Sequence, residues 1–350
     1  MAVKRKKALW PHIYIINNEG KKMESLIFAF NSVSPIILTV AVGYLLKKIG
    51  LMTAEFAKQA NKLVFRVFLP AMLFLNVYGI ESMQAVNLGY VIYSLVALLV
   101  IFALAIPTVI LLTDKKKCRG ALLQGVFRSN YALIGIPLAS SLFPGEGAAV
   151  ATLLSAVMVP AFNILAVIGL SIFNNEGKKP SAKKVVFGIV KNPLILGIVS
   201  GLAALGIRAI FVKMGISFRL SDVGAIYSTL KYLSNIATPL ALLVLGAQFE
   251  FSAIPSLKKE IISGVILRSV IVPLLGIGVA YLAFRSSFGG AQFASLVAVF
   301  CTPVAVSSVP MAQEMGADAE LAGQLVVFTT ITSAFTVFFA SFLLKFAGIF

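Results

Sequence analysis

Acidic residues and metal ligands are scarce in this chain of 350 residues. It has 13 aspartates and glutamates against 30 lysines and arginines, two cysteines and a single histidine. The histidine, His12, lies outside the long apolar runs, and acids are nearly absent from those runs. The sequence contains no metal-ligand cluster, no nucleophile elbow and no phosphate-binding loop. We therefore expect no enzyme, no resident cofactor and no metal site.

Apolar residues dominate the composition instead. They make up 59% of the chain, charged residues make up only 12%, and the mean hydropathy is +0.97. A helix needs about 20 apolar residues to cross the bilayer core, and runs of about that length recur between short polar segments. The sequence predicts an all-α polytopic membrane protein of about ten transmembrane helices. We place them at residues 25–46, 57–80, 88–112, 120–142, 147–173, 192–213, 226–249, 260–284, 291–313 and 320–347.

The chain divides into two halves that resemble each other. We predict a first five-helix repeat at 23–173, a basic cytoplasmic linker at 174–191 and a second five-helix repeat at 192–350. Prolines occupy matching places in three helix pairs: Pro35 with Pro193, Pro70 with Pro239, and Pro137 with Pro310. Because five is odd, the second repeat must enter the membrane from the opposite side. The two repeats are therefore predicted to be inverted, a plan that many transporters share.

Positive charge is concentrated in loops rather than on one patch. The loops after the first, third, fifth and seventh predicted helices hold most of the lysines. The positive-inside rule places these loops in the cytoplasm and both chain termini on the outer side of the membrane. We expect that membrane to be the inner or plasma membrane of the cell. The basic residues behind the formal charge of +17 then serve to orient the protein in the lipid bilayer. We therefore expect no nucleic-acid partner.

The first 22 residues differ from the rest of the chain. Residues 1–22 carry four basic residues in succession, and a fresh apolar segment begins at Met23. We interpret 1–22 as a basic extension that is not native, with Met23 as the initiator. An ordinary basic tail is the alternative. The positive charge of residues 1–22 opposes the orientation that the basic loops favour.

Two polar interruptions occur at matching places, in the fourth and ninth predicted helices. Ser129-Asn130 interrupts the fourth helix and Thr302-Pro303 the ninth, where the proline lacks an N–H and clashes with the preceding turn. We expect both helices to break there and to restart with free N–H groups at Tyr131–Leu133 and at Val304–Val306. Each restart carries roughly +0.5 elementary charge, so two converging restarts form an anion site.

Asn130 has a simpler interpretation as well. A buried amide can join packed transmembrane helices, a contribution of about 0.6–2 kcal/mol. The alignment of its interruption with Pro303 favours a binding site over this packing role. Arg128, two residues before the break, either assists an anion or has a structural part, and both are open. Arg268 lies deep in the eighth predicted helix, where an ionised side chain suggests function, although its partner is not evident.

Three segments carry a resemblance to a known family. The segment "SNYALIGIPL" (Ser129–Leu138) resembles the P-N-T-L-V-M-G-I-P-L type of segment in plant PIN members of the auxin efflux carrier family. Asn130 and the run Gly135–Leu138 match it, while Ser129 replaces the first proline. "TPVAVSSVPMAQEMGAD" and "TPLALLVLGAQF" are similar to the family's ninth and seventh helices. The short central loop is typical of a bacterial member, such as an organic-acid permease.

The resemblance implies a secondary transporter with a scaffold part and a mobile transport part. It implies that a small organic carboxylate such as malate or malonate, or another mono- or dicarboxylate, binds where helices four and nine cross, with Asn130 as the substrate amide. Two alternatives are a sodium-coupled carrier of the bile-acid symporter type and, less favoured, a channel, which would need rings of polar groups. Coupling to H⁺ or Na⁺ and assembly as a homodimer are left open.

The candidate site follows from the two breaks and this resemblance together. The predicted substrate-binding residues are Arg128, Ser129, Asn130, Tyr131, Asn163, Pro303, Val304 and Ser307. The prolines expected to shape the crossover are Pro137, Pro303 and Pro310. No catalytic residue is predicted.

Overall fold

The computed structural model describes residues 34–79, 87–144, 146–173 and 190–350. The predicted extension at 1–22 and most of the linker at 174–191 lie outside these residues. Within the described ranges the chain is helical, and its only extended pairing is an isolated bridge between Ser129 and Val304. The helices are 34–48, α2 (Ala54–Leu63), α3 (Leu69–Tyr78), α4 (Leu88–Leu112), α5 (Lys116–Phe127), α6 (Ile136–Leu142), α7 (Gly147–Phe173), α9 (Pro193–Lys213), α10 (Gly224–Gln248), α11 (Ile254–Ile266), α12 (Val279–Phe284), α13 (Gly290–Phe300), α14 (Ser308–Glu314) and α15 (Ala319–Phe346).

Many of these helices are long and apolar enough to cross a membrane. Seven such stretches occur among the described residues: Ala54–Tyr78, Leu88–Leu112, Gly147–Phe173, Pro193–Lys213, Gly224–Gln248, Phe251–Phe284 and Ala319–Phe346. Two shorter apolar helices, Tyr131–Leu142 and Gly290–Phe300, flank the interruptions discussed below. The prediction of an all-helical, multi-pass membrane protein is thus confirmed. The ten-helix count and the inverted symmetry stay predictions.

Short π-helical turns widen several of the helices. One at Val64–Phe68 joins α2 to α3, and two at Leu267–Ile271 and Leu274–Gly278 lie between α11 and α12. A π turn leaves the normal ladder of backbone hydrogen bonds and is common at functional positions. Arg268 lies in the second of these turns.

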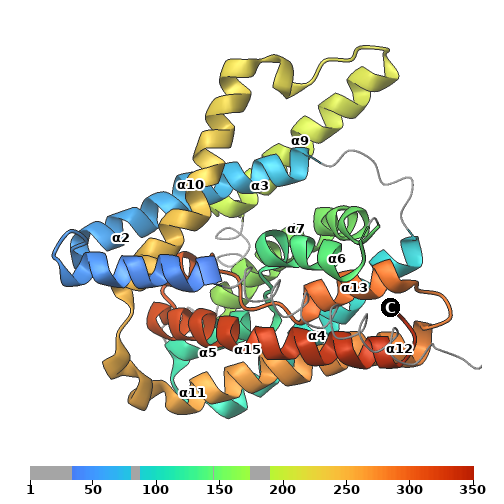
Figure 1. Ribbon diagram of the computed structural model, residues 1–350. Helices are drawn as coiled ribbons and strands as arrows, with labels where there is room; N and C mark the ends of the chain where they lie inside the picture. Colours follow the sequence, from blue (N-terminus) through green and yellow to red (C-terminus); the bar gives the residue numbers. More distant parts are fainter. Residues whose placement is uncertain (1–33, 80–86, 145, 174–189) are drawn as a thin grey trace, which may run out of the picture.

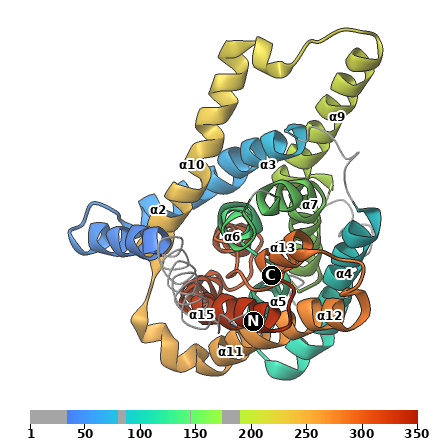
Figure 2. The same cartoon turned by 45° about the vertical axis from the view of Figure 1, so that its right-hand side comes forward.

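The helices form two groups that lie side by side (Figures 1 and 2). The small helix group comprises 34–48, α2, α3, α9 and α10, and the large helix group comprises α4–α7 and α11–α15. Within the small group α3 packs along both α9 and α10, whereas in the large group α15 packs along α5, α11 and α14. The two groups touch each other mainly through α14 against α2 and through α7 against α3 and α9.

Glycines let the helices of the small group approach closely. A β-carbon on Gly246 of α10 would lie 1.9 Å from the carbonyl oxygen of Val40, and one on Gly197 of α9 would lie 2.6 Å from that of Pro70. Small residues at such contacts bring helix backbones together, which replaces the hydrophobic drive that lipid removes. These contacts fix the small group as a packed unit.

Loops that the sequence places on one side of the membrane gather at one end of the molecule. Contacts joining them are Lys47 with Glu250, Lys115 Nζ with Ser256 O at 2.6 Å, and the amide of Asp318 with Lys117 O at 3.0 Å. The acidic loop 314–320 therefore lies beside the basic start of α5. This shared end agrees with the predicted loop sides, while the orientation of the termini stays a prediction.

Candidate functional site

The first interrupted segment breaks over three residues. Helix α5 ends at Phe127, Arg128 has extended backbone angles (φ −85°, ψ 115°), and a π turn at Tyr131–Gly135 begins the next helix, which continues into α6. The first hydrogen bond of that helix runs from the Ile134 amide to Asn130 O at 3.1 Å. The amides of Tyr131–Leu133 precede it and so have no partner within the helix.

The second interrupted segment breaks over a longer stretch. Helix α13 ends at Phe300 and α14 begins only at Ser308. The expectation of free amides at Val304–Val306 is wrong for its first two members. The Val304 amide donates to Thr329 Oγ1 of α15 at 3.1 Å, and the Ala305 amide donates to Arg128 O at 3.4 Å. The two amides are used because this part of the break, which pairs with Ser129 at Val304, lies between α15 and the other break.

The two breaks meet and satisfy one another. The backbone N–H of Asn130 donates to Pro303 O at 2.8 Å, and the hydroxyls of Ser129 and Thr302 lie 2.6 Å apart. Backbone groups that leave a helix inside a membrane must find partners in the protein or in a water-filled cavity. Each break supplies hydrogen-bond partners for the other. Ser129 and Pro303 are thus used in the contact between the two breaks.

The side chain of Asn130 has a different status. It is half-buried, and among the described residues its amide makes no hydrogen bond. An amide that joined two helices would need such a partner. The side-chain amide of Asn130 and the backbone amides of Tyr131–Leu133 are all hydrogen-bond donors. The helix that starts at Tyr131 also carries a partial positive charge at this end.

The Tyr131 side chain points elsewhere. Its hydroxyl donates to Ala151 O at 2.9 Å and lies 2.8 Å from Ser295 Oγ, between α7 and α13. The ring is 1% exposed. Only the backbone amide of Tyr131, and not its phenol, is left as a candidate for binding.

Arg128 gathers several of the predicted residues around its guanidinium. Its Nη1 donates to Gln124 Oε1 at 2.8 Å and also contacts Met311 Sδ, while its Nη2 donates to Asn163 Oδ1 at 2.7 Å and Ser307 Oγ at 2.8 Å. The side chain is 2% exposed. All of these partners are neutral, and the ion pairs found among the described residues do not involve Arg128.

Arg268 lies on the other side of the same breaks. Its Nε and Nη2 donate to Thr302 O at 3.0 and 2.6 Å, and Nη2 also donates to Val299 O at 3.2 Å. Its Nη1 donates to Val126 O at 3.3 Å and Phe127 O at 3.4 Å. The carbonyls of Val299, Val126 and Phe127 belong to the last turns of α13 and α5, where a helix has no internal partner for its last carbonyl groups. Thr302 lies two residues beyond α13, in the break itself. Arg268 therefore binds the ends of α5 and α13 and the break that follows α13.

The breaks, the long apolar helices and the sequence together identify the kind of protein. A model of the family described as "Membrane transport protein" matches residues 28–341. The chain belongs to this membrane transport protein family, which is the auxin efflux carrier-like family. It is a membrane transporter and not an enzyme.

Two relatives of the transporter carry matching descriptions. An uncharacterized transporter of Methanothermobacter thermautotrophicus is 25% identical over 310 residues, which is 86% of this chain and 94% of the relative. An uncharacterized transporter of Methanocaldococcus jannaschii is 28% identical over 224 residues, which is 63% of this chain and 68% of the relative.

The crossover prolines of the transporter shape the segments that follow the breaks. Pro137 follows the π turn at Tyr131–Gly135, and a proline ring that excludes the normal turn before it accounts for such widening. Pro310 lies in the first turn of α14, where its missing N–H would have no helical partner in any case.

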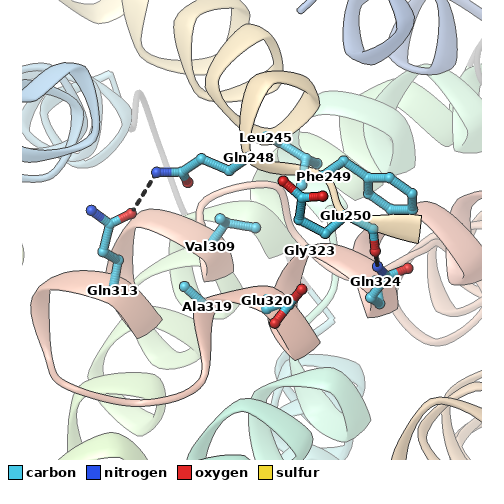
Figure 3. Close-up of a pocket in the computed structure, with 10 residues that line it drawn as sticks. All are labelled: Leu245, Gln248, Phe249, Glu250, Val309, Gln313, Ala319, Glu320, Gly323 and Gln324. Carbon is cyan, nitrogen blue, oxygen red and sulfur yellow. Dashed lines mark hydrogen bonds between the residues drawn. The ribbon is translucent and has the colours of Figure 1, made fainter. Parts of the chain in front are cut away.

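Two features escaped sequence reasoning. Gln124 was missed although it lies four residues before Arg128 within the predicted span 120–142, a spacing that brings two side chains of a helix together. A pocket of about 300 Å³ also lies between α10 and the pair α14–α15. Its lining residues are Leu245, Gln248, Phe249, Glu250, Val309, Gln313, Ala319, Glu320, Gly323 and Gln324 (Figure 3).

The amides of this pocket join the two helix groups. Gln248 Nε2 donates to Gln313 Oε1 at 3.1 Å (Figure 3), and Asn61 of α2 donates to the oxygens of both glutamines. Asn61 and Gln248 belong to the small group and Gln313 to the large group. The pocket therefore lies on the boundary between the groups, and α14 connects it to the Arg128 cluster through Met311.

Proposed function

We propose that this protein is a secondary transporter that moves a small organic carboxylate anion across the membrane by alternating access. The substrate binds where the two interrupted segments meet. The observation that carries the proposal is the uncommitted side-chain amide of Asn130 beside the amides of Tyr131–Leu133, which have no helical partner. Donors at the start of a helix suit an anion.

The proposed architecture has ten spans in two inverted five-helix repeats. The interruptions support it because they fall in the fourth and ninth predicted spans and pair in an antiparallel sense. A crossing of this kind is the arrangement that inverted repeats produce at the bilayer midplane. The gathering of the basic loops at one end supports termini on the outer side of the cell membrane.

A carboxylate is the favoured substrate because the amides of Tyr131–Leu133 are hydrogen-bond donors without a partner in their helix. The amides at the start of a helix hold anions without any charged side chain, as they do in many phosphate and carboxylate sites. Together with the family resemblance, this supports malate, malonate or another mono- or dicarboxylate as cargo.

Alternating access requires two parts that move relative to each other. The small helix group is proposed as the scaffold and the large helix group as the moving part that carries the crossing. Support comes from the limited contact between the groups and from the pocket that already opens along their boundary. The amide contacts of Asn61, Gln248 and Gln313 would break when the groups separate.

The test is uptake into proteoliposomes of a labelled panel that contains malate, malonate, acetate and benzoate. Gradients of Na⁺, of pH and of voltage are imposed one at a time, so that coupling to Na⁺, to H⁺ or to neither is read from the same assay. Saturable uptake of at least one carboxylate, competed by unlabelled acid, supports the proposal. Transport of none of the acids, or flux that does not saturate as through a channel, contradicts it.

A further inference from the structure

The Arg128 cluster contains one positive charge and no negative one. Its four closest partners are an amide oxygen from Gln124, an amide oxygen from Asn163, the Ser307 hydroxyl and the Met311 sulfur. An arginine keeps its charge inside proteins, and a buried ion without an opposite charge is strongly unfavourable. The cluster therefore holds a charge that the described residues do not balance.

One buried donor of this cluster is unused, and a second lies close to it in the chain. Gln124 Nε2 is fully buried and has no hydrogen-bond partner among the described residues, although the oxygen of the same amide accepts from Arg128. The buried hydroxyl of Ser308, next in the chain to Ser307, also lacks a partner there. Buried polar groups without partners are rare in native proteins and call for an explanation.

A carboxylate supplies what the cluster needs. It brings one negative charge for Arg128, and its oxygens accept the hydrogen bonds that the Gln124 amide has to give. The side-chain oxygens of Ser307 and Asn163 can turn away from the guanidinium, because rotation of a side chain disturbs no helix. Arg128 also lies in extended backbone two residues before Asn130, and alternate residues of an extended segment project to the same side.

We propose that Arg128 is the counter-charge of the transported anion, and that the Gln124 amide is a second donor to the same carboxylate. This inference rests on the proposed function and specifies its substrate class. Every cargo must present an ionised carboxylate to Arg128, and the equivalent neutral amide is rejected. A second carboxylate, where the cargo has one, faces Asn130 and the amides of Tyr131–Leu133.

The decisive variant is Gln124→Glu, which keeps the size of the side chain and introduces a carboxylate beside Arg128. The protein then supplies the negative charge itself. We expect melting to occur at the wild-type temperature or above, because a buried charge gains a partner, and we expect carboxylate binding to be lost. The control is Gln59→Glu on the exposed face of α2, which adds the same charge and should leave binding unchanged.

A charge ladder on one carbon skeleton provides the readout. Malonate, malonamate and malonamide have nearly the same shape and carry two, one and no carboxylates. Binding of each to the purified full chain is measured by calorimetry and by ligand-induced thermal shift. Wild-type protein should bind the two acids and reject malonamide, with at least a tenfold difference. Arg128→Gln should weaken the two acids roughly ten- to a hundredfold and leave malonamide unaffected.

Further variants keep the test informative if Arg128→Gln does not fold. Arg128→Lys retains the charge and loses the planar fork, so it should bind malonate more weakly than wild type and more tightly than Arg128→Gln. Arg66→Gln, at an arginine whose side chain is 59% exposed, should leave all three affinities unchanged.

The outcomes separate this inference from the proposed function. If folded Gln124→Glu binds malonate and malonamate as tightly as wild type does, Arg128 is not the counter-charge, and transport of carboxylates stands without it. If the wild-type protein takes up acids of the panel and malonamide equally well, the inference is again overturned. If wild-type protein neither binds nor transports any carboxylate, both proposals are wrong.

Discussion

Two buried arginines lie on opposite sides of the same pair of breaks, and their surroundings differ. Both side chains are 2% exposed. The Arg268 guanidinium donates only to backbone carbonyls, at the ends of α5 and α13 and at Thr302 in the break after α13, whereas the partners of the Arg128 guanidinium are all side chains. A backbone carbonyl cannot leave its place unless the helix unravels. A side chain can rotate away, so Arg128 is able to exchange partners and Arg268 is not.

The two arginines also differ in how their positive charge is compensated. The end of a helix carries roughly −0.5 elementary charge, so the ends of α5 and α13 together offset the charge of Arg268. Neutral side chains offer no such compensation to Arg128. The comparison teaches that an intramembrane arginine can be a structural cap or a ligand-binding group, and that its partners distinguish the two roles.

The largest effect is expected for Arg268→Gln. The change removes five hydrogen bonds and leaves the carbonyls at two helix ends without a donor, and each unpaired buried group costs about 1–3 kcal/mol. We expect a loss of more than about 3 kcal/mol in the free energy of unfolding. The measurement is the fraction of protein that stays monodisperse after heating in detergent.

Arg268→Lys serves as the matched variant. A single ammonium cannot reach the carbonyls of both helix ends in the way that a planar fork can, so it should restore little of the stability. A melting temperature close to that of wild type in either Arg268 variant would remove the structural half of the comparison.

A smaller effect, on affinity rather than stability, is expected for Asn130→Leu. This side chain makes no hydrogen bond with the described residues, so its loss should leave the fold intact. Binding of a transported acid should weaken by about 1.5–3 kcal/mol, the value of a hydrogen bond to a charged group, or roughly ten- to a hundredfold. Arg66→Gln is the control and should change affinity much less. Wild-type affinity in folded Asn130→Leu protein, measured by calorimetry, would overturn the site assignment.

Thr329→Val tests the backbone side of the comparison. The change keeps the shape of the side chain and removes the acceptor of the Val304 amide. We expect stability to fall by about 1–2 kcal/mol because a buried N–H loses its partner. Thr330→Val is the matched control, since that hydroxyl bonds only to Val326 O within its own helix. Thermal unfolding of the two variants side by side measures the difference, and equal melting temperatures would contradict it.

The smallest effect is expected for Lys47→Gln at the loop end of the molecule. The ion pair with Glu250 is partly exposed, with side-chain exposures of 32% and 51%. Pairs of this kind contribute about 0–1 kcal/mol, so the melting temperature should hardly move. A destabilisation as large as that of Arg268→Gln would mean that exposed charges matter as much as the buried helix caps.

The sequence by itself determined the features that depend on neighbouring residues. The lengths of the apolar runs predict a multi-pass helical protein, and the structure and the family match confirm it. The polar pair at Asn130 and the proline at Pro303 mark interruptions, because the preference of a residue for a helix is a local property. The contact between Gln124 and Arg128 was also within reach, since four residues span one helical turn.

Only the tertiary structure decided which groups are free and which are used. Arg268 bonds to Val126, 142 residues away in the chain, and Thr329 captures the amide of Val304, which was expected to be free. No local pattern specifies such partners, because a hydrogen bond depends on where two distant segments pack. The charge that Arg128 carries follows from its side chain alone. Its lack of a negative partner among the residues that the structure describes is a property of the fold, and that property is what makes the cluster a candidate for binding an anion.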